Sequence, residues 1–127
     1  MLENDYIVKQ IKEMTRALIN MLFHVDTDSP TEDLLDTQSA KEQYRELCRL
    51  ADQGELNEAG NELYDLLEAE EKEALKIALL YYSYINDKDS AFLEAHDYDR
   101  DEIKSDLKES MTQEDLDTLK ALYEKYK

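Results

Sequence analysis

Residues 44–67, with the sequence YRELCRLADQGELNEAGNELYDLL, predict two helices joined by a tight turn. Apolar residues recur before and after Gly54 at spacings of three and four, which places each set on one helical face. Gly54 can take the left-handed conformation that satisfies the last carbonyls of a helix, so we expect the first helix to stop there. Asn57 is the expected N-cap of the returning helix. The stretch therefore predicts an antiparallel helical hairpin, which we place at 40–67.

This hairpin resembles a tetratricopeptide repeat. Its second helix has a small residue, Ala59, four positions before a large one, Leu63, as in the pattern of that repeat. In the first helix, four residues stand in the places of the pattern's Trp, Leu, Gly and Tyr, with a turn one residue shorter than usual. They are Tyr44, Leu47, Cys48 and Ala51. The resemblance implies a helical-repeat fold in which the first helix of each hairpin lines a concave groove.

A partial second repeat is expected at 72–96. When the hairpin sequence is aligned with the sequence thirty-four residues later, the period of the tetratricopeptide repeat, residues of similar character pair. The resulting pairs are Leu47 with Tyr81, Leu50 with Tyr84, Ala51 with Ile85, Asp52 with Asn86 and Ala59 with Leu93. Leu63 falls on Asp97, so the second helix of this repeat is expected to be truncated.

The chain as a whole is similar to an uncharacterised family of small, acidic, all-helical bacterial proteins. The segments that carry the similarity are NDYI at 4–7, FLEAH at 92–96 and YDRDEI at 98–103. The resemblance brings no known activity with it.

We expect one all-α domain of six or seven helices over residues 1–127. One proline and two glycines leave few breaks in the chain, which favours long helices. Hydrophobic residues make up 42% of the chain, enough for a folded core although 37% of the residues are charged. Outside 40–67 and 72–96, we expect a long N-terminal helix at 1–25, packed with the hairpins, and C-terminal helices within 99–127.

Local signals set three further expectations about the helices. Ser29 can act as an N-cap, Pro30 suits a first helical position and Glu32 completes a capping box. Residues 36–39 show little apolar periodicity, so a short helix or an irregular link is expected before the hairpin. The densest apolar run of the chain, at 74–85, predicts the core helix.

The net charge of −17 lies entirely beyond residue 25, because 1–25 carry three acids and three bases. Such a field repels nucleic acid and anionic membranes, so we expect no direct binding of either. Two alternative functions follow from the same distribution. The carboxylates could imitate phosphates and occupy a basic groove of another protein, as a mimic of nucleic acid does. The uncharged, apolar first helix could instead form the interface of a homodimer with a structural role.

The residues that could carry chemistry do not group into a site. His24 and His96 are the only histidines, and neither has a second His or a Cys at a helical metal-ligand spacing. Three alternating aspartates start like a calcium loop, but Glu102 and Lys108 stand where its Gly and its bidentate Glu belong. Cys48 has apolar helical neighbours, so we expect no nucleophile there, and a lone cysteine favours a reducing cytoplasm. We therefore expect no enzyme, cofactor or metal ion.

The expected function is that of a non-catalytic protein–protein interaction module. Helical repeats without clusters of polar residues ordinarily present a surface and do not build a reaction site. The partner is expected to be a protein or peptide that the sequence does not identify.

The expected peptide-binding residues are Arg45, Arg49, Lys76 and Asn86. If Tyr44 stands in the place of the repeat's Trp, both arginines project into the concave groove, and Lys76 and Asn86 join them from the second repeat. Guanidinium groups at i and i+4 can hold a carboxylate, so an acidic peptide or a free C-terminus could dock there. Ordinary ion pairs with acidic residues of the same helix are the alternative explanation.

Overall fold

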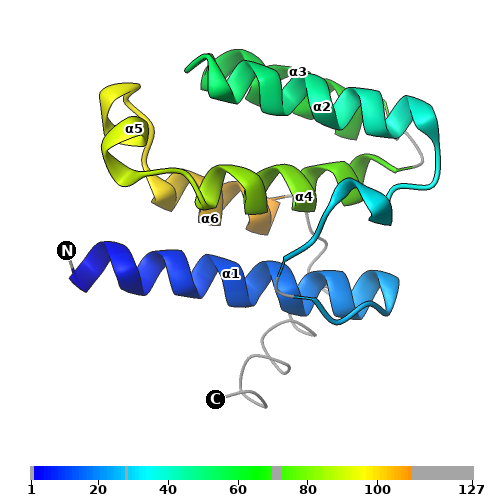
Figure 1. The fold of residues 1–127 in the computed structure, drawn as a ribbon, viewed down its shortest axis with the longest axis horizontal. Helices are drawn as coiled ribbons and strands as arrows, with labels where there is room; N and C mark the ends of the chain where they lie inside the picture. The colour runs from blue at the N-terminus through cyan, green and yellow to red at the C-terminus, as the bar shows by residue number, and fades with distance from the viewer. Residues whose placement is uncertain (1, 28, 70–72, 110–127) are drawn as a thin grey trace.

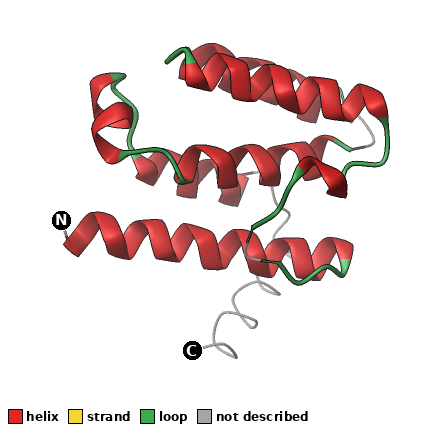
Figure 2. Ribbon diagram, viewed as in Figure 1, coloured by secondary structure: helices red, strands yellow, loops and turns green. Residues whose placement is uncertain are grey.

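The structure is a computed structural model that describes residues 2–27, 29–69 and 73–109. Every regular element in those ranges is helical, which confirms the all-α prediction (Figure 2). The six α-helices there fall within the expected number, and one short 3-10 helix, η1, accompanies them. Their bounds are α1 Leu2–Phe23, η1 Glu32–Leu34, α2 Gln38–Asp52, α3 Leu56–Glu68, α4 Ala74–Asn86, α5 Ser90–Ala95 and α6 Arg100–Glu109. The last predicted helix, after residue 110, lies outside the described residues.

Helix α4 occupies the centre of the fold, as its apolar run predicts. In Figure 1 it lies between the α2–α3 hairpin and α1, and α6 packs against both α4 and α1. Buried residues occur on every side of α4, because runs of consecutive residues, which point to different sides of a helix, are buried. The buried residues are Ala74, Ile77, Ala78, Leu79, Leu80, Tyr81, Tyr82, Ile85 and Asn86.

The apolar stripe of α1 is covered within the chain. Ile11 and Leu18 are fully buried, and the helix packs against α4 and α6. Thr15 is buried as well, and its hydroxyl donates to the carbonyl of Ile11 at 2.9 Å. A homodimer through α1 stays a prediction, and it would have to use the other face of this helix. Within the described part of the chain, no helix has both the length and the apolar character needed to cross a membrane.

The turn between α2 and α3 is closed by Gly54, as predicted. Its φ is 82°, in the left-handed region. The N–H of Gly54 donates to the carbonyl of Ala51 at 3.0 Å, and the N–H of Glu55 donates to that of Leu50 at 2.9 Å. These two bonds satisfy the last carbonyls of α2 and send the chain back along it. Helix α3 therefore returns beside α2, and the two form the expected antiparallel hairpin (Figure 1).

His96 packs directly on Gly54. A Cβ at Gly54 would lie 2.2 Å from the Nε2 atom of His96, so only glycine fits beneath the imidazole. The ring is held in place by its Nδ1 atom, 2.8 Å from the carbonyl of Phe92. The centroid of the Phe92 ring lies 4.5 Å from that of the imidazole. The end of α5 is thus docked on the turn of the hairpin.

The α4–α5 connection has the same length as the α2–α3 connection. Asp52 and Asn86 end their helices thirty-four residues apart, and Leu56 and Ser90 begin the next ones at the same separation. Asp89 caps α5 by accepting from the N–H of Ala91 at 3.2 Å. Helix α5 ends at Ala95 after only six residues and stands at one end of the fold (Figure 1).

Three helix starts differ from the sequence prediction. The N-cap of η1 is Thr31, which accepts from the N–H of Asp33 at 3.3 Å, and not Ser29. Helix α2 starts at Gln38, earlier than expected, because Thr37 caps it. Helix α3 starts at Leu56, so Asn57 is already helical and is not the cap. The short turn at Gly54 leaves no room for a separate capping residue after Glu55.

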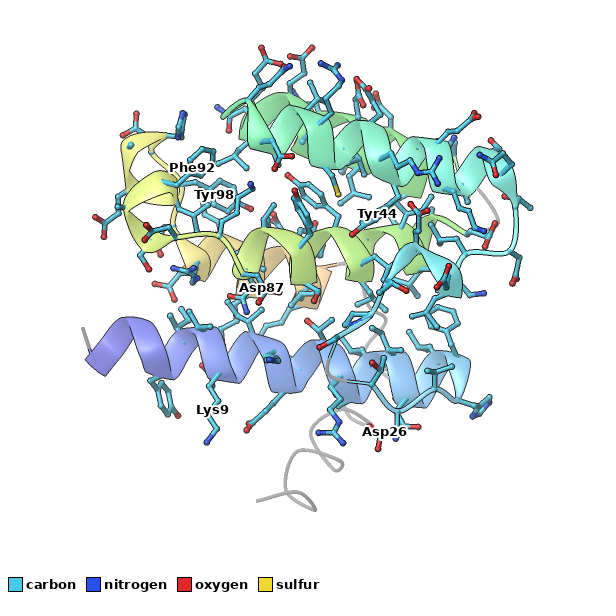
Figure 3. The ribbon with its side chains drawn as sticks, viewed as in Figure 1. Lys9, Asp26, Tyr44, Asp87, Phe92 and Tyr98 are labelled. Carbon is cyan, nitrogen blue, oxygen red and sulfur yellow. The ribbon has the colours of Figure 1, made fainter. Side chains whose placement is uncertain are left out.

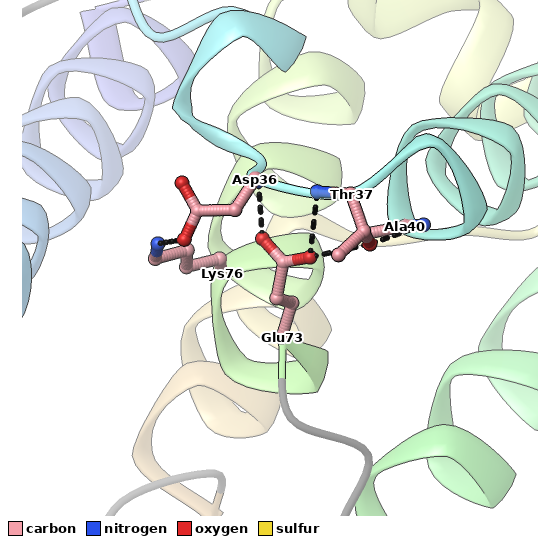
Figure 4. Close-up of polar contacts among 5 residues, drawn as sticks. All are labelled: Asp36, Thr37, Ala40, Glu73 and Lys76. Atoms are coloured by element: carbon pink, nitrogen blue, oxygen red, sulfur yellow. Dashed lines mark hydrogen bonds and ion pairs between the residues drawn. The ribbon is translucent and has the colours of Figure 1, made fainter.

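A buried carboxylate joins the starts of α2 and α4. Glu73, at the N-cap position of α4, is only 8% exposed. It accepts from the N–H groups of Asp36 at 2.5 Å and Thr37 at 3.1 Å, and from the Thr37 hydroxyl at 2.7 Å (Figure 4). That hydroxyl in turn accepts from the N–H of Ala40 at 3.1 Å. Glu73 therefore lies where the positive ends of two helix dipoles meet.

The two glycines of the hairpin should respond to alanine in opposite directions. Gly54→Ala should destabilise the fold by about 1–2 kcal/mol for the left-handed backbone alone, and further through the clash with His96. Gly60→Ala in α3 should stabilise it by about 0.5–1 kcal/mol, because a Cβ there meets no other atom within 4 Å. Urea unfolding followed by circular dichroism measures both changes. Equal effects of the two substitutions would contradict the turn geometry.

Glu73→Gln should destabilise the protein by about 1–3 kcal/mol at neutral pH, because an NH2 group replaces one of the two carboxylate oxygens that accept from Asp36 and Thr37. Burial raises the pKa of Glu73, but the hydrogen bonds from Asp36 and Thr37 outweigh it and hold the pKa below its usual value. The carboxylate therefore stabilises the fold above its unfolded-state pKa, and this contribution is lost as pH falls through the folded-state pKa.

Urea titrations of wild type and Glu73→Gln across the acid range test this pH dependence. The difference in unfolding free energy between the two proteins should shrink as pH falls. Glu58→Gln, at an exposed carboxylate of α3, is the matched control and should change stability little. A difference that stays constant down to strongly acidic pH would refute the role given to the Glu73 charge.

Candidate functional site

The two predicted arginines are exposed and paired with nearby carboxylates. Arg45 holds Glu32 of η1 with two bonds, from Nε at 2.8 Å and from Nη2 at 2.5 Å. Arg49 pairs with Glu46 one turn earlier, with its Nε 2.9 Å from the carboxylate, and also donates to Gln53. These hydrogen bonds lower the pKa values of both glutamates. Arg49 therefore has the same-helix ion pair that the alternative explanation expects, whereas the partner of Arg45 lies on η1.

Lys76 and Asn86 lie near opposite ends of α4. The Nζ atom of Lys76 is 3.2 Å from the carboxylate of Asp36 and 5.0 Å from the centre of the Phe23 ring. Asn86 is 2% exposed, and its amide donates to the carbonyl of Val8 in α1 at 3.0 Å. Ten residues of helix separate the two by about 15 Å. The four residues thus do not converge on one groove, and peptide binding at them stays a prediction.

The side chains that could act chemically lie where a structural role explains them. His24 and His96 each directly follow the end of a helix. Tyr44 lies between α2 and α4 (Figure 3), next to Cys48, and burial raises the pKa of the Cys48 thiol to about 11. Among the described residues, no group of three or more His, Cys, Asp and Glu side chains is arranged to hold a metal ion.

A groove of about 450 Å³ between α3 and α6 is the strongest candidate for a functional surface. We call it the tyrosine groove. Its α3 side is formed by Asn57, Gly60, Asn61 and Tyr64. Tyr81 and Tyr82 of α4 lie at its base, together with Tyr98, which precedes α6. Its α6 side is formed by Glu102, Ser105 and Asp106.

The tyrosines of this groove range from fully buried to largely exposed. Tyr81 is 1% exposed, with its ring centre 5.7 Å from that of Tyr82. Burial raises the pKa values of Tyr81 and Tyr98, so both hydroxyls stay protonated at neutral pH. Tyr64 is 60% exposed, one of the two most exposed large apolar side chains in the described residues, and its hydroxyl donates to Glu68 at 2.8 Å. The groove therefore offers aromatic surface that a ligand can reach.

Gly60 opens the groove along α3. It is exposed, lies in the middle of the helix, and has no other atom within 4 Å of the place of a Cβ. A glycine inside a helix costs about 1 kcal/mol relative to alanine, so its presence there is unfavourable for the helix itself. The absence of a side chain allows another molecule to approach the backbone of α3 closely.

A larger cleft, of about 670 Å³, lies between α1, α5 and α6, but its polar groups bind the helices to one another. Arg100, 7% exposed, donates to the carbonyls of Asn86 at 3.0 Å and Lys88 at 2.5 Å, and to the Ser90 hydroxyl at 2.6 Å. Lys104 of α6 donates to Gln10 of α1 at 2.9 Å. Arg100 thus holds the end of α4, and Lys104 joins α6 to α1.

A third groove, between α2 and α3, is acidic. Two carboxylates from each helix line it, Glu42 and Glu46 from α2 and Glu62 and Asp65 from α3. Burial and then the neighbouring Glu46 and Glu58 raise the pKa of Glu62. The two short rows of carboxylates are therefore close enough to affect one another.

The tyrosine groove is not predicted by the sequence pattern. Its two sides come from α3 and α6, which are about forty residues apart and are brought together by α4. One signal was present, because an interior helical glycine such as Gly60 indicates either a close approach of another group or a loss of stability. The exposure of Tyr64 could not be read from spacing, since it shares apolar periodicity with the buried Leu63.

Comparison with known proteins gives one match. A family model described as a family of unknown function (DUF6483) matches residues 1–115. No curated protein and no solved structure matches the chain.

Cys48 should react slowly with iodoacetamide at neutral pH, because burial keeps the thiol protonated up to about pH 11. The rate should rise to that of an unstructured cysteine peptide once urea unfolds the chain. Mass spectrometry of the alkylated protein over time measures both rates. Rapid alkylation of the folded protein at neutral pH would show that the thiol is more accessible and more acidic than its surroundings indicate.

Proposed function

The chain belongs to DUF6483, a family of unknown function, and we propose that it is a non-catalytic protein-binding module of helical-repeat type. The observation that supports this function best is the tyrosine groove, which combines exposed Tyr64 with an open helix face at Gly60. Tyrosine is enriched in protein interfaces because its ring offers apolar contact area and its hydroxyl offers a hydrogen bond. The partner in this proposal is a segment of another protein.

The repeat-like spacing also supports the proposal. Two helix–turn–helix units have three-residue connections thirty-four residues apart, the period of a tetratricopeptide repeat. The paired positions Leu47 and Tyr81 are both buried, and so are Ala59 and Leu93. Repeats of this type present extended binding surfaces to other proteins. The reducing cytoplasm expected from free Cys48 is part of the same proposal.

The second candidate is a mimic of nucleic acid, and the acidic groove favours it. Glu42 and Glu46 form one row of carboxylates on α2, and Glu62 and Asp65 form a second row on α3. Two such rows could occupy a basic groove. Arg49 neutralises part of one row through its pair with Glu46. A mimic should bind basic proteins in competition with duplex DNA, whereas a module that uses the tyrosine groove should not be displaced by DNA.

A display library of random peptides tests binding at the tyrosine groove. Selection on the wild-type protein, after removal of peptides that bind Gly60→Trp, should enrich ligands of the groove. The indole should fill the groove without disturbing the fold, since a side chain at Gly60 meets no other atom within 4 Å of its Cβ. Affinity for enriched peptides should fall at least about tenfold in Gly60→Trp, equal to about 1.4 kcal/mol.

Glu58→Trp is the matched control for this selection. It adds the same side chain to the same helix at an exposed position outside the groove. Affinity of the selected peptides should be the same as for wild type in this variant. The proposal fails if no peptide is enriched, or if the enriched peptides bind Gly60→Trp as tightly as they bind wild type.

A further inference from the structure

We propose that the tyrosine groove recognises a segment of a partner protein that carries arginine. This inference rests on the proposed function and names the chemistry of its ligand. It follows from three features of the groove, which are its charge, its aromatic faces and the open backbone at Gly60.

Within the described part of the chain, the charged residues that line the groove are all acidic. They are Glu102 and Asp106, both from α6. Glu102 is exposed, and one of its oxygens accepts from the N–H of Asp99 at 3.1 Å, which fixes the carboxylate at the start of α6. The whole chain carries a net charge of −17, so a basic ligand is also attracted from a distance. An acidic ligand or a second copy of the chain would be repelled.

The aromatic faces beside these carboxylates favour a cation. A guanidinium or ammonium group is attracted to the face of a tyrosine ring, and more strongly where a carboxylate is close. Tyr64 is the accessible ring, and Tyr81, Tyr82 and Tyr98 extend the aromatic surface inward. The groove thus combines the two elements of a cation site, with rings on α3, on α4 and just before α6, and carboxylates on α6.

The protein already contains one occupied site of this kind. The Nζ atom of Lys88 lies 5.1 Å from the centre of the Tyr84 ring and 4.9 Å from that of Phe92. It also donates to the carboxylate of Asp52 at 2.6 Å, and the Tyr84 hydroxyl donates to the same oxygen at 2.7 Å. Two aromatic faces and one carboxylate therefore hold a cation within this fold, as we propose for the ligand in the tyrosine groove.

Arginine suits the groove better than lysine. Its guanidinium is planar, is less strongly hydrated than an ammonium group, and can stack on a ring while it donates to a carboxylate. Gly60 lets the backbone of the ligand lie close to α3, and Asn57 and Asn61 at the same edge can exchange hydrogen bonds with it.

Fluorescence anisotropy with two defined probes tests this inference. One probe is a fluorescein-labelled, alanine-rich helical peptide with two arginines one turn apart, and the other has lysines in their place. Titrations use the full chain at about 0.15 M salt, where long-range attraction is screened. The arginine peptide should bind several-fold more tightly than the lysine peptide.

Two pairs of variants locate the binding site. Tyr64→Ala should weaken binding of the arginine peptide roughly 2- to 30-fold, the range of a cation–π contact, while Tyr6→Ala should not change it. Tyr6 is the matched control because it is an exposed tyrosine, 69% accessible, on α1. Glu102→Gln should weaken binding and Glu58→Gln should not, although both remove one charge. Glutamine preserves the cap of α6, so the first of these variants should fold.

Equal losses in Glu102→Gln and Glu58→Gln, or unchanged binding in Tyr64→Ala, would overturn the inference by showing that overall charge attracts the peptide. Equal affinity for the two probes would overturn it as well. The display selection separates this failure from that of the proposed function. Groove ligands without arginine overturn this inference alone, whereas the lack of any ligand sensitive to Gly60→Trp overturns both.

Discussion

Helix α4 is apolar around most of its circumference, and the rest of the chain is arranged to cover it. A helix of this kind is stable in water only when neighbours exclude solvent from every side. The α2–α3 hairpin covers one side, α1 covers the opposite side, and α6 packs against α4 and α1 together. The tyrosine groove is a product of this arrangement, because α3 and α6 both pack on α4 and leave the groove between them at Tyr81 and Tyr82.

A buried charged side chain lies at each end of α4. Hydrogen bonds compensate each charge for its burial among apolar neighbours. Glu73 at its start accepts hydrogen bonds from the start of α2, and Arg100 near its end donates to the carbonyls of Asn86 and Lys88. Each charge has the sign that the helix dipole favours at that end. In the described residues, no buried side-chain nitrogen or oxygen lacks a hydrogen-bond partner. Position and direction of α4 are therefore fixed by polar contacts as well as by packing.

Features with local causes could be predicted from the sequence, and features with distant causes could not. Gly54 ends α2 through contacts within five residues, so its role was readable from the turn. The partners of Glu73 are 36 and 37 residues away, and nothing near Glu73 indicates them. Asn86 was assigned to a groove by repeat spacing, but α1 covers it, and no repeat pattern includes α1. The surface that a helix exposes depends on which neighbours it acquires.

The position of α1 beneath α4 has a consequence for the order of events during synthesis. The ribosome releases α1 before the helices that cover its apolar stripe, and α4 ends roughly 60 residues later, which takes about 3–12 s at typical rates. The α2–α3 hairpin needs only its own residues and can form within this interval. The nascent chain thus exposes the apolar residues of α1 for several seconds, a state that chaperones recognise and that the finished protein no longer shows.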